Sequence, residues 1–234
     1  TVSASTASVT LILHSGTGTL AGPVTVNAVN GIAEFPGIDI DELGDFTLKA
    51  SSAGLYEDIS DSFNVSDQTA PQISLTGSDP QFVTAGNAYN ESGATATDNI
   101  DGDISPSIII DASAVNTAVA GDYIVTYNLT DAAGNAATEV ERTVTVIPGA
   151  VDATTTTINV NMASVSADDF STSTITVRAK DSNGNNRTST SGTVVLNATG
   201  SATISSVVDN LDGTYTATIK NAVAENVTIS GTIG

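Results

Sequence analysis

Residues 121–129, which read Gly-Asp-Tyr-Ile-Val-Thr-Tyr-Asn-Leu, decide the fold class of this 234-residue chain. From Tyr123 onward a large apolar side chain takes every second position, and a period of two is typical of a β-strand with one buried face. The same alternation occurs at residues 9–13, 158–162 and 175–179. Gly, Asn and Asp separate such runs at intervals of about 8–12 residues and no helical pattern stands out, so the sequence predicts an all-β chain of sandwiches.

A short motif occurs three times and predicts how many sandwiches there are. A turn glycine is followed by a polar residue, an aromatic residue and an alternating run at residues 44–48, 121–125 and 213–217. The spacing of the copies is close to the ~100 residues of an immunoglobulin-like module. The aromatic residue resembles the tyrosine corner of that fold. We therefore expect three modules in tandem.

Short segments that contain proline mark the boundaries between these modules. They lie at residues 67–71 and 147–150. Linkers of this composition are typical domain boundaries. The predicted modules are residues 1–66, 67–147 and 150–234, hereafter the first, middle and third modules.

The first module is shorter than the others before its glycine motif. By its place in the order, its first strong strand, residues 8–13, matches residues 193–198 of the third module, so the counterparts of strands A and B are missing. An open sandwich exposes apolar surface and unpaired strand edges. We expect them to be covered, either by an upstream segment or by a strand that an identical subunit donates.

The charge balance excludes several partners. Lys and Arg number 6 and Asp and Glu number 26, which gives a net charge of −20. Binding to nucleic acid needs a basic surface, so no nucleic-acid partner is expected, and an anionic membrane surface is disfavoured for the same reason. No apolar run approaches the ~20 residues of a membrane-spanning helix, so we expect no membrane insertion within this chain.

The residue types that most catalytic sites need are scarce. Cysteine is absent, which excludes disulfides, thiolate metal sites and a cysteine nucleophile. The single histidine, His14, cannot form a zinc site with several histidines and makes a Ser–His–Asp triad improbable. Tryptophan is absent and aromatic residues make up only 4%, which disfavours a glycosidase cleft with aromatic platforms. The sequence therefore predicts that the chain is not an enzyme.

The middle and third modules resemble two known families. Residues 70–147 resemble the immunoglobulin-like repeat of bacterial surface proteins, and residues 151–234 resemble the invasin/intimin-type immunoglobulin-like module. The motifs of the middle module are residues 70–75, 94–103, 120–123 and 130–135. Those of the third module are residues 173–177, 180–185 and 211–215. The first module is similar to the C-terminal part of another such repeat through residues 29–35.

The resemblance implies an architecture, a location and a function. Such modules form elongated tandem arrays in adhesin stalks, surface-layer proteins and extracellular filaments. It therefore implies a structural or adhesive segment, without catalysis, of a bacterial or archaeal surface protein, outside the cell. Its partners would be neighbouring modules, identical subunits, a surface receptor or a glycan. The alternative is a set of accessory spacer or glycan-binding modules in a secreted polysaccharide-degrading enzyme.

Acidic residues gather in three segments that the sandwich topology should bring to one pole of the middle module. One segment is the loop after the second strand, another follows residues 121–129, and the third is the linker before the first strand. Several carboxylates would repel one another there, and calcium, which takes 6–8 oxygen ligands, would relieve that repulsion. Ordinary solvated turns remain the alternative. The predicted calcium ligands are Asp67, Asp98, Asn99, Asp101, Asp103, Asp131 and Asn135.

A second, weaker calcium site is expected in the third module. Asp181, Asn183 and Asn185 have the spacing of the start of a calcium loop, but no bidentate Glu follows at the required distance. Asp152, near the linker, and Glu225, after the third glycine motif, are the further ligands predicted for it.

Overall fold

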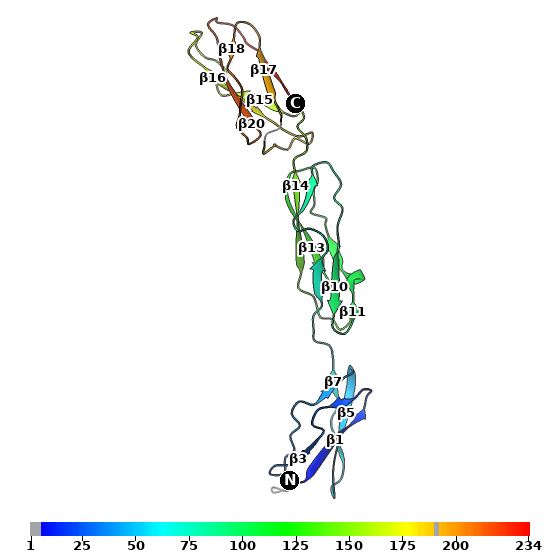
Figure 1. The fold of residues 1–234 in the computed structure, drawn as a ribbon. Coiled ribbons are helices and arrows are strands. Elements are labelled where there is room, and N and C mark those ends of the chain that lie inside the picture. Colours follow the sequence, from blue (N-terminus) through cyan, green and yellow to red (C-terminus); the bar gives the residue numbers. More distant parts are fainter. Residues whose placement is uncertain (1–5, 190–191) are drawn as a thin grey trace. The chain divides into compact units, whose positions relative to one another are not determined.

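The computed structural model describes residues 6–189 and 192–234 (Figure 1). Within those ranges all regular structure is β except one short 3-10 turn, η1 (Ser105–Ser107). The chain divides into two compact units. One contains the residues up to Gln72 together with Thr97–Ile104 and Thr130–Ala137, and the other contains the rest. The all-β prediction is confirmed.

The first module has one main sheet, in the order β3-β1-β5-β6, with β7 also paired to β5. Strands β1 and β5 are antiparallel and place Leu11 opposite Ala50 and Leu13 opposite Leu48. The only other pairing among its described strands is that of β2 with β4, two residues each. The strands are β1 (Ser8–Ser15), β2 (Leu20–Ala21), β3 (Thr25–Asn27), β4 (Asp39–Ile40), β5 (Gly44–Ser52), β6 (Asp58–Ile59) and β7 (Phe63–Val65).

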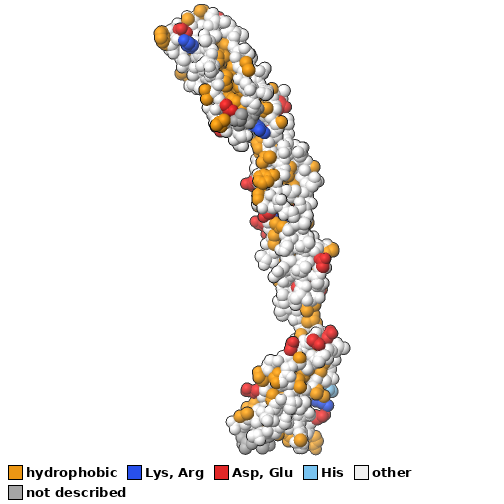
Figure 2. Space-filling model, viewed as in Figure 1, with side chains coloured by type: hydrophobic (Ala, Val, Ile, Leu, Met, Phe, Trp, Pro, Cys, Tyr) orange, Lys and Arg blue, Asp and Glu red, His pale blue; other side chains and the backbone are white. Residues whose placement is uncertain are grey.

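The core of the first module is small. Of its described hydrophobic side chains, only Ala28 and Phe46 are buried, whereas Leu11, Leu13 and Leu48 on the sheet face remain partly exposed. Hydrophobic side chains reach the surface of this module in Figure 2. An open sandwich produces this pattern, because the only pairing outside the main sheet among the described strands of this module is the two-residue pair of β2 with β4. Which segment covers it stays a prediction.

The middle module is a closed sandwich of two sheets, β11-β10-β8 and β12-β13-β14-β9. Strand β13 contains residues 121–128 of the stretch that predicted the fold class, and its Val125 and Tyr127 are fully buried. Strand β9 runs parallel to β14 and closes that sheet. The strands are β8 (Gln72–Leu75), β9 (Gln81–Thr84), β10 (Ala94–Asp98), β11 (Gly102–Asp103), β12 (Ile109–Asp111), β13 (Gly121–Asn128) and β14 (Val140–Ile147).

A buried arginine lies among the apolar side chains of the middle module. Arg142 is 0% exposed; its Nε donates to the Tyr127 hydroxyl at 2.8 Å and lies 3.6 Å from a Glu91 carboxylate oxygen. Its terminal nitrogens donate to three backbone carbonyls, of Thr76 (2.6 Å), Gly93 (3.0 Å) and Ser78. The guanidinium thereby joins both sheets of the sandwich.

The charge of Glu91 is maintained inside this cluster. Burial raises the pKa of Glu91, but hydrogen bonds from Tyr127 and Tyr89 outweigh it, so that the pKa is lowered overall. The Tyr127 hydroxyl donates to Glu91 at 2.5 Å. The arginine is therefore matched by an ionised carboxylate at neutral pH.

The third module contains two sheets. One has the order β15-β16-β20-β18, with β19 also paired to β20, and the other consists of β17 and β21. Its core is built around Ile175, Val177, Ala179 and Tyr215, all buried. The strands are β15 (Thr157–Val160), β16 (Ser173–Arg178), β17 (Val194–Ala198), β18 (Thr203–Ile204), β19 (Val208–Asp209), β20 (Thr214–Lys220) and β21 (Ile229–Ile233).

The repeated glycine motif marks a strand start in every module but not the same strand. Strand β13 pairs with the strand that follows it, β14, whereas the strand that follows β20, β21, pairs with β17 instead. The Tyr123 hydroxyl donates to the carbonyl of Val119, four residues upstream, as a tyrosine corner does, but the Tyr215 hydroxyl donates to the carbonyl of Gly192. A glycine followed by an aromatic residue is local turn chemistry that different strands can use.

Candidate metal centre

Three carboxylates meet at one end of the middle module, as its topology predicts. Asp67 lies between β7 and β8, Asp98 ends β10, and Asp131 follows β13. One carboxylate oxygen from each lies within 4.8 Å of the others. The three residues are only 7%, 9% and 8% exposed, respectively. Segments that are far apart in the sequence thus bring three acidic groups to one nearly buried place.

Asp67 and Asp98 each use one carboxylate oxygen to accept hydrogen bonds from backbone N–H groups two or three residues further along the chain. Oδ1 of Asp67 accepts from the Thr69 N–H at 2.9 Å, and Oδ1 of Asp98 accepts from the N–H groups of Ile100 and Asp101 at 2.8 and 3.0 Å. The Oδ2 atom of each is buried and has no hydrogen-bond partner. A buried charged oxygen without a partner is costly, so these two atoms call for a ligand.

Asp131 is the carboxylate that the protein stabilises most directly. Its Oδ1 accepts from the Asn135 N–H at 2.7 Å, and its Oδ2 accepts from the Asn135 side-chain amide at 2.8 Å. Burial raises the pKa of Asp131, but these hydrogen bonds outweigh it and the pKa is lowered. The group therefore carries a negative charge at neutral pH.

The other predicted ligands of this region take different places. Asp101 contacts the loop after β13 instead of the three carboxylates, because its Oδ2 accepts a hydrogen bond from the Ala132 N–H at 2.9 Å. Asn135 donates to the Asp67 carbonyl at 3.3 Å and so supports the site from outside. Asn99 and Asp103 are exposed and do not belong to the three-carboxylate cluster. The structure therefore brings together three of the seven predicted ligands and places two as supports.

The electrostatics of the cluster favour a cation. At a separation of about 5 Å and an effective dielectric constant of about 20, Asp67 and Asp98 would repel each other by about 3 kcal/mol. No Lys, Arg or His forms an ion pair with these carboxylates among the described residues. An all-oxygen donor set of this kind suits a hard divalent cation.

The corresponding loop of the third module satisfies its aspartate with protein groups. Oδ2 of Asp181 accepts from the Gly149 N–H at 2.8 Å and from the Asn185 amide at 2.9 Å. Its Oδ1 accepts from the N–H groups of Asn183 and Asn185 at 3.0 and 2.8 Å. Both oxygens therefore have partners, and the pKa of Asp181 is lowered by these bonds despite its burial.

The remaining predicted ligands of the third module do not join Asp181. The Asp152 carboxylate accepts from Thr154. Glu225 accepts from the Ser201 N–H at 2.6 Å and lies at the other end of the module. The prediction for Glu225 treated β20 as the counterpart of β13. Because β20 pairs antiparallel with β16, the loop after β20 lies beside Ser173, whereas Asp181 follows the opposite end of β16.

Asn185 instead fastens the third module to the middle one. Its side-chain oxygen accepts from the Ala120 N–H at 2.9 Å, and its amide donates to the Ala118 carbonyl at 3.0 Å. Arg187 adds hydrogen bonds to the carbonyls of Pro148, at 3.2 Å, and Gly149. Asn185, which its sequence spacing assigned to a metal, thus forms a direct contact between two modules of the chain.

The replacement Asn185→Ala is expected to loosen this junction. The change removes the acceptor of the Ala120 N–H and the donor to Asp181, and a loss of this kind costs roughly 1–3 kcal/mol. Hydrogen exchange should show a faster rate at the Ala120 amide. The control Ser182→Ala, in the same loop, should leave that rate unchanged; equal rates in both variants would contradict the assignment.

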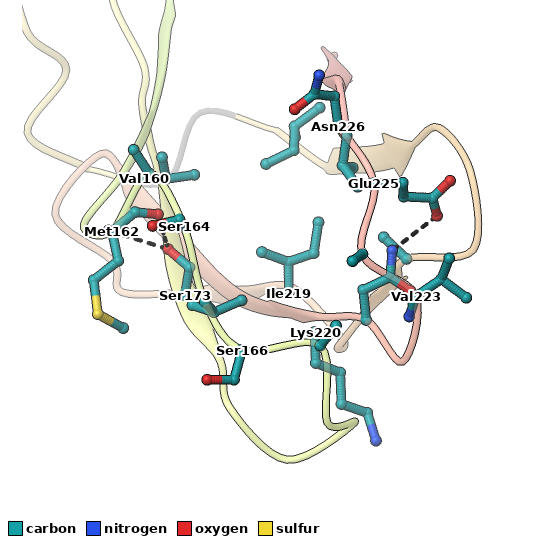
Figure 3. Close-up of a pocket in the computed structure, with 18 residues that line it drawn as sticks. Val160, Met162, Ser164, Ser166, Ser173, Ile219, Lys220, Val223, Glu225 and Asn226 are labelled. Carbon is teal, nitrogen blue, oxygen red and sulfur yellow. Dashed lines mark hydrogen bonds between the residues drawn. The ribbon is translucent and has the colours of Figure 1, made fainter.

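A pocket of about 780 Å³ lies in the third module between the segment after β15 and the loop after β20 (Figure 3). Val160, Met162 and Ile219 provide apolar surface, and Glu225 stands at its rim, where it is hydrogen-bonded to Asn221. None of the lining residues is aromatic. The pocket therefore lacks the flat stacking surface that a sugar ring would use.

Two functional features were not predicted from the sequence. Arg142 lies on the same inward-facing side of β14 as Val140, Val144 and Val146. A charged residue among alternating apolar residues was the feature of the sequence that could have predicted its burial. The loops 131–135 and 181–185 share the pattern Asp-x-x-Gly-Asn and the same internal hydrogen bonds. What each loop contacts could be seen only in the folded chain.

Comparison with known families separates the chain into two matched parts. Residues 73–146 match the family described as bacterial surface protein, Ig-like domain. Residues 152–234 match invasin, domain 3. The outer cell wall protein of Brevibacillus brevis is 36% identical over 96 residues, which covers 35% of this chain and 10% of that protein. The chain therefore spans about a tenth of the length of this relative.

Intimin and invasin are two of the proteins whose solved structures are similar to this chain. The D00-D0 domain of intimin is 18% identical with a TM-score of 0.41, over 70% of this chain and 92% of that one. Invasin, a bacterial integrin-binding protein, is 17% identical with a TM-score of 0.38, over 98% of this chain and 50% of that one. The assignment itself rests on the two family models. Residues 73–146 and 152–234 are thus two immunoglobulin-like domains of bacterial type in tandem.

Proposed function

We propose that the chain is a non-catalytic structural or adhesive segment of an extracellular surface protein, acting as a stalk or as a filament subunit. The observation that carries this proposal is the succession of sandwich modules joined by short segments, one of which is fastened by Asn185. A series of modules that are individually folded transmits force and sets a distance. Chemistry is not required for that role.

The chain is located at the cell surface or outside the cell. The family matched by residues 73–146 is one of bacterial surface proteins, and the Brevibacillus relative is an outer cell wall protein. No helix in the described part of the chain has the length and hydrophobicity needed to cross a membrane. The net charge of −20 suits an aqueous, salt-containing environment.

Calcium fits this role as a stiffening element. The carboxylates of Asp67, Asp98 and Asp131 come from the segment before β8 and from two loops of the middle module. A divalent ion held by all three would fix the direction of that segment. The partners of this chain would then be the neighbouring modules, and a receptor or glycan would bind elsewhere in the longer protein.

Mechanical unfolding of single molecules tests the proposed function. The full chain, held between two handles, should unfold in separate steps, with about 250–300 Å of length released for a module of some 80 residues, and should refold on relaxation. A panel of glycans and polysaccharides should give neither binding at millimolar concentration nor turnover. Turnover, or glycan binding at that level, would overturn the proposal and favour the accessory modules of a secreted polysaccharide-degrading enzyme.

A further inference from the structure

The geometry points to one calcium ion per chain, bound by Asp67, Asp98 and Asp131, as a clamp on the segment that leads into β8. The binding site is inferred from the geometry of the three side chains alone. The role of the clamp, which is to stiffen a stalk, rests on the proposed function. Two independent observations support the site. Three carboxylates converge within 4.8 Å, and two of them, in side chains more than nine-tenths buried, carry an oxygen without any hydrogen-bond partner.

The surrounding hydrogen bonds build the site before an ion arrives. Asp98 is held by two backbone N–H groups at 2.8 and 3.0 Å, Asp67 by one at 2.9 Å, and Asp131 by Asn135. Asp101 joins the two loops through the Ala132 N–H. The ligands are therefore positioned by the backbone, so that an ion need not order the loops for itself, and this favours affinity.

Calcium suits the donor set better than magnesium does. The site offers carboxylate oxygens from three separate segments and leaves further coordination positions to water. Calcium accepts 6–8 oxygens at flexible angles, whereas magnesium demands near-ideal octahedral geometry and dehydrates reluctantly. We therefore expect magnesium to bind more weakly, by at least tenfold.

The two linkers of the chain differ in their need for metal. At the linker 67–71 the aspartates face one another with unpartnered oxygens. At the linker 147–150, Oδ2 of Asp181 accepts hydrogen bonds from the Gly149 N–H and from the Asn185 side-chain amide. Hydrogen-bond donors from the protein thus take the place that the ion would have at the first linker. The first linker should respond to calcium and the second should not.

Calorimetric titration of the full chain with Ca²⁺, together with native mass spectrometry, tests the stoichiometry and the site. We expect one Ca²⁺ per chain. The variant Asp98→Asn keeps an Oδ1 acceptor for the turn and removes the negative charge facing the cluster, so affinity should fall at least tenfold. The control Glu141→Gln makes the same change of charge at an exposed position of β14 and should leave affinity unchanged. No binding to the original chain, or undiminished binding to Asp98→Asn, would overturn the site, and two ions per chain would overturn the metal-free second linker.

Limited digestion with an unspecific protease tests the clamp separately. In Ca²⁺, cleavage within residues 66–71 should be at least tenfold slower than in a chelator, while cleavage within 147–150 should proceed at the same rate in both. The Asp98→Asn variant, checked by circular dichroism for an intact fold, should be cleaved at the faster rate in either condition. If calcium binds without protecting this segment, the clamp is refuted while the site stands. The proposed function fails only through the force and glycan measurements, so the failures can be distinguished.

Discussion

The replacement Arg142→Met is expected to destabilise the middle module by about 3–5 kcal/mol, the range for breaking a buried ion pair from one side. Methionine fills much of the same volume but leaves Glu91 charged and without its cation. It also removes the donors to the carbonyls of Thr76, Ser78 and Gly93. Since domains are stable by only about 5–15 kcal/mol in total, the loss is a large share.

Chemical denaturation followed by hydrogen exchange in β13 and β14 measures this effect. The matched control is Arg178→Met in the third module, because the Arg178 side chain makes a single hydrogen bond to the described part of the chain, to the Asp212 carbonyl at 3.2 Å. That change should cost less than about 1 kcal/mol. A similar, small loss in both variants would show that the buried guanidinium does not hold the two sheets together. The double variant Arg142→Met with Glu91→Gln should recover part of the stability, since the uncompensated charge is then gone.

The replacement Phe46→Ala should unfold the first module while leaving the rest of the chain folded. Phe46 is 1% exposed and, with Ala28, provides the buried hydrophobic side chains described in this module. Its ring lies 6.2 Å from that of Phe63. Removal of a buried phenylalanine costs about 3–5 kcal/mol, and a small core has little stability in reserve.

Hydrogen exchange resolved by segment is the suitable measurement, because the modules report separately. Strands β1 and β5 should lose their protection in Phe46→Ala, and β13 and β16 should keep theirs. Phe82→Ala is the control, since the Phe82 side chain is 65% exposed on β9 and should change protection little. Retained protection in β1 and β5 would mean that the half-buried face of Leu11, Leu13 and Leu48 is stabilised by contacts other than this core.

The sequence specified the strands and the acidic pole for physical reasons that act locally. Alternation at residues 121–129 requires that one face be buried, and Val125 and Tyr127 are indeed buried. The convergence of Asp67, Asp98 and Asp131 also followed from the sequence, once strand order was assumed, because strand ends at one pole of a sandwich must meet. The identity of the turn residues, in contrast, does not show which of them belong to the carboxylate cluster and which only hold the loops together. Asp98 and Asp101, for example, look alike in the sequence.

The sequence by itself therefore determined the β-strands, their modular succession and the place where acidic groups gather, since these depend on period, turns and topology. Only the tertiary structure decided which carboxylate oxygens lack a partner, that Gly149 satisfies Asp181, and that Glu225 lies at the opposite end of its module. Those outcomes depend on strand pairing and on single donors brought from distant positions, such as the Gly149 N–H. A hydrogen bond forms or fails within a few tenths of an ångström, and residue spacing along the chain does not encode distances of that kind.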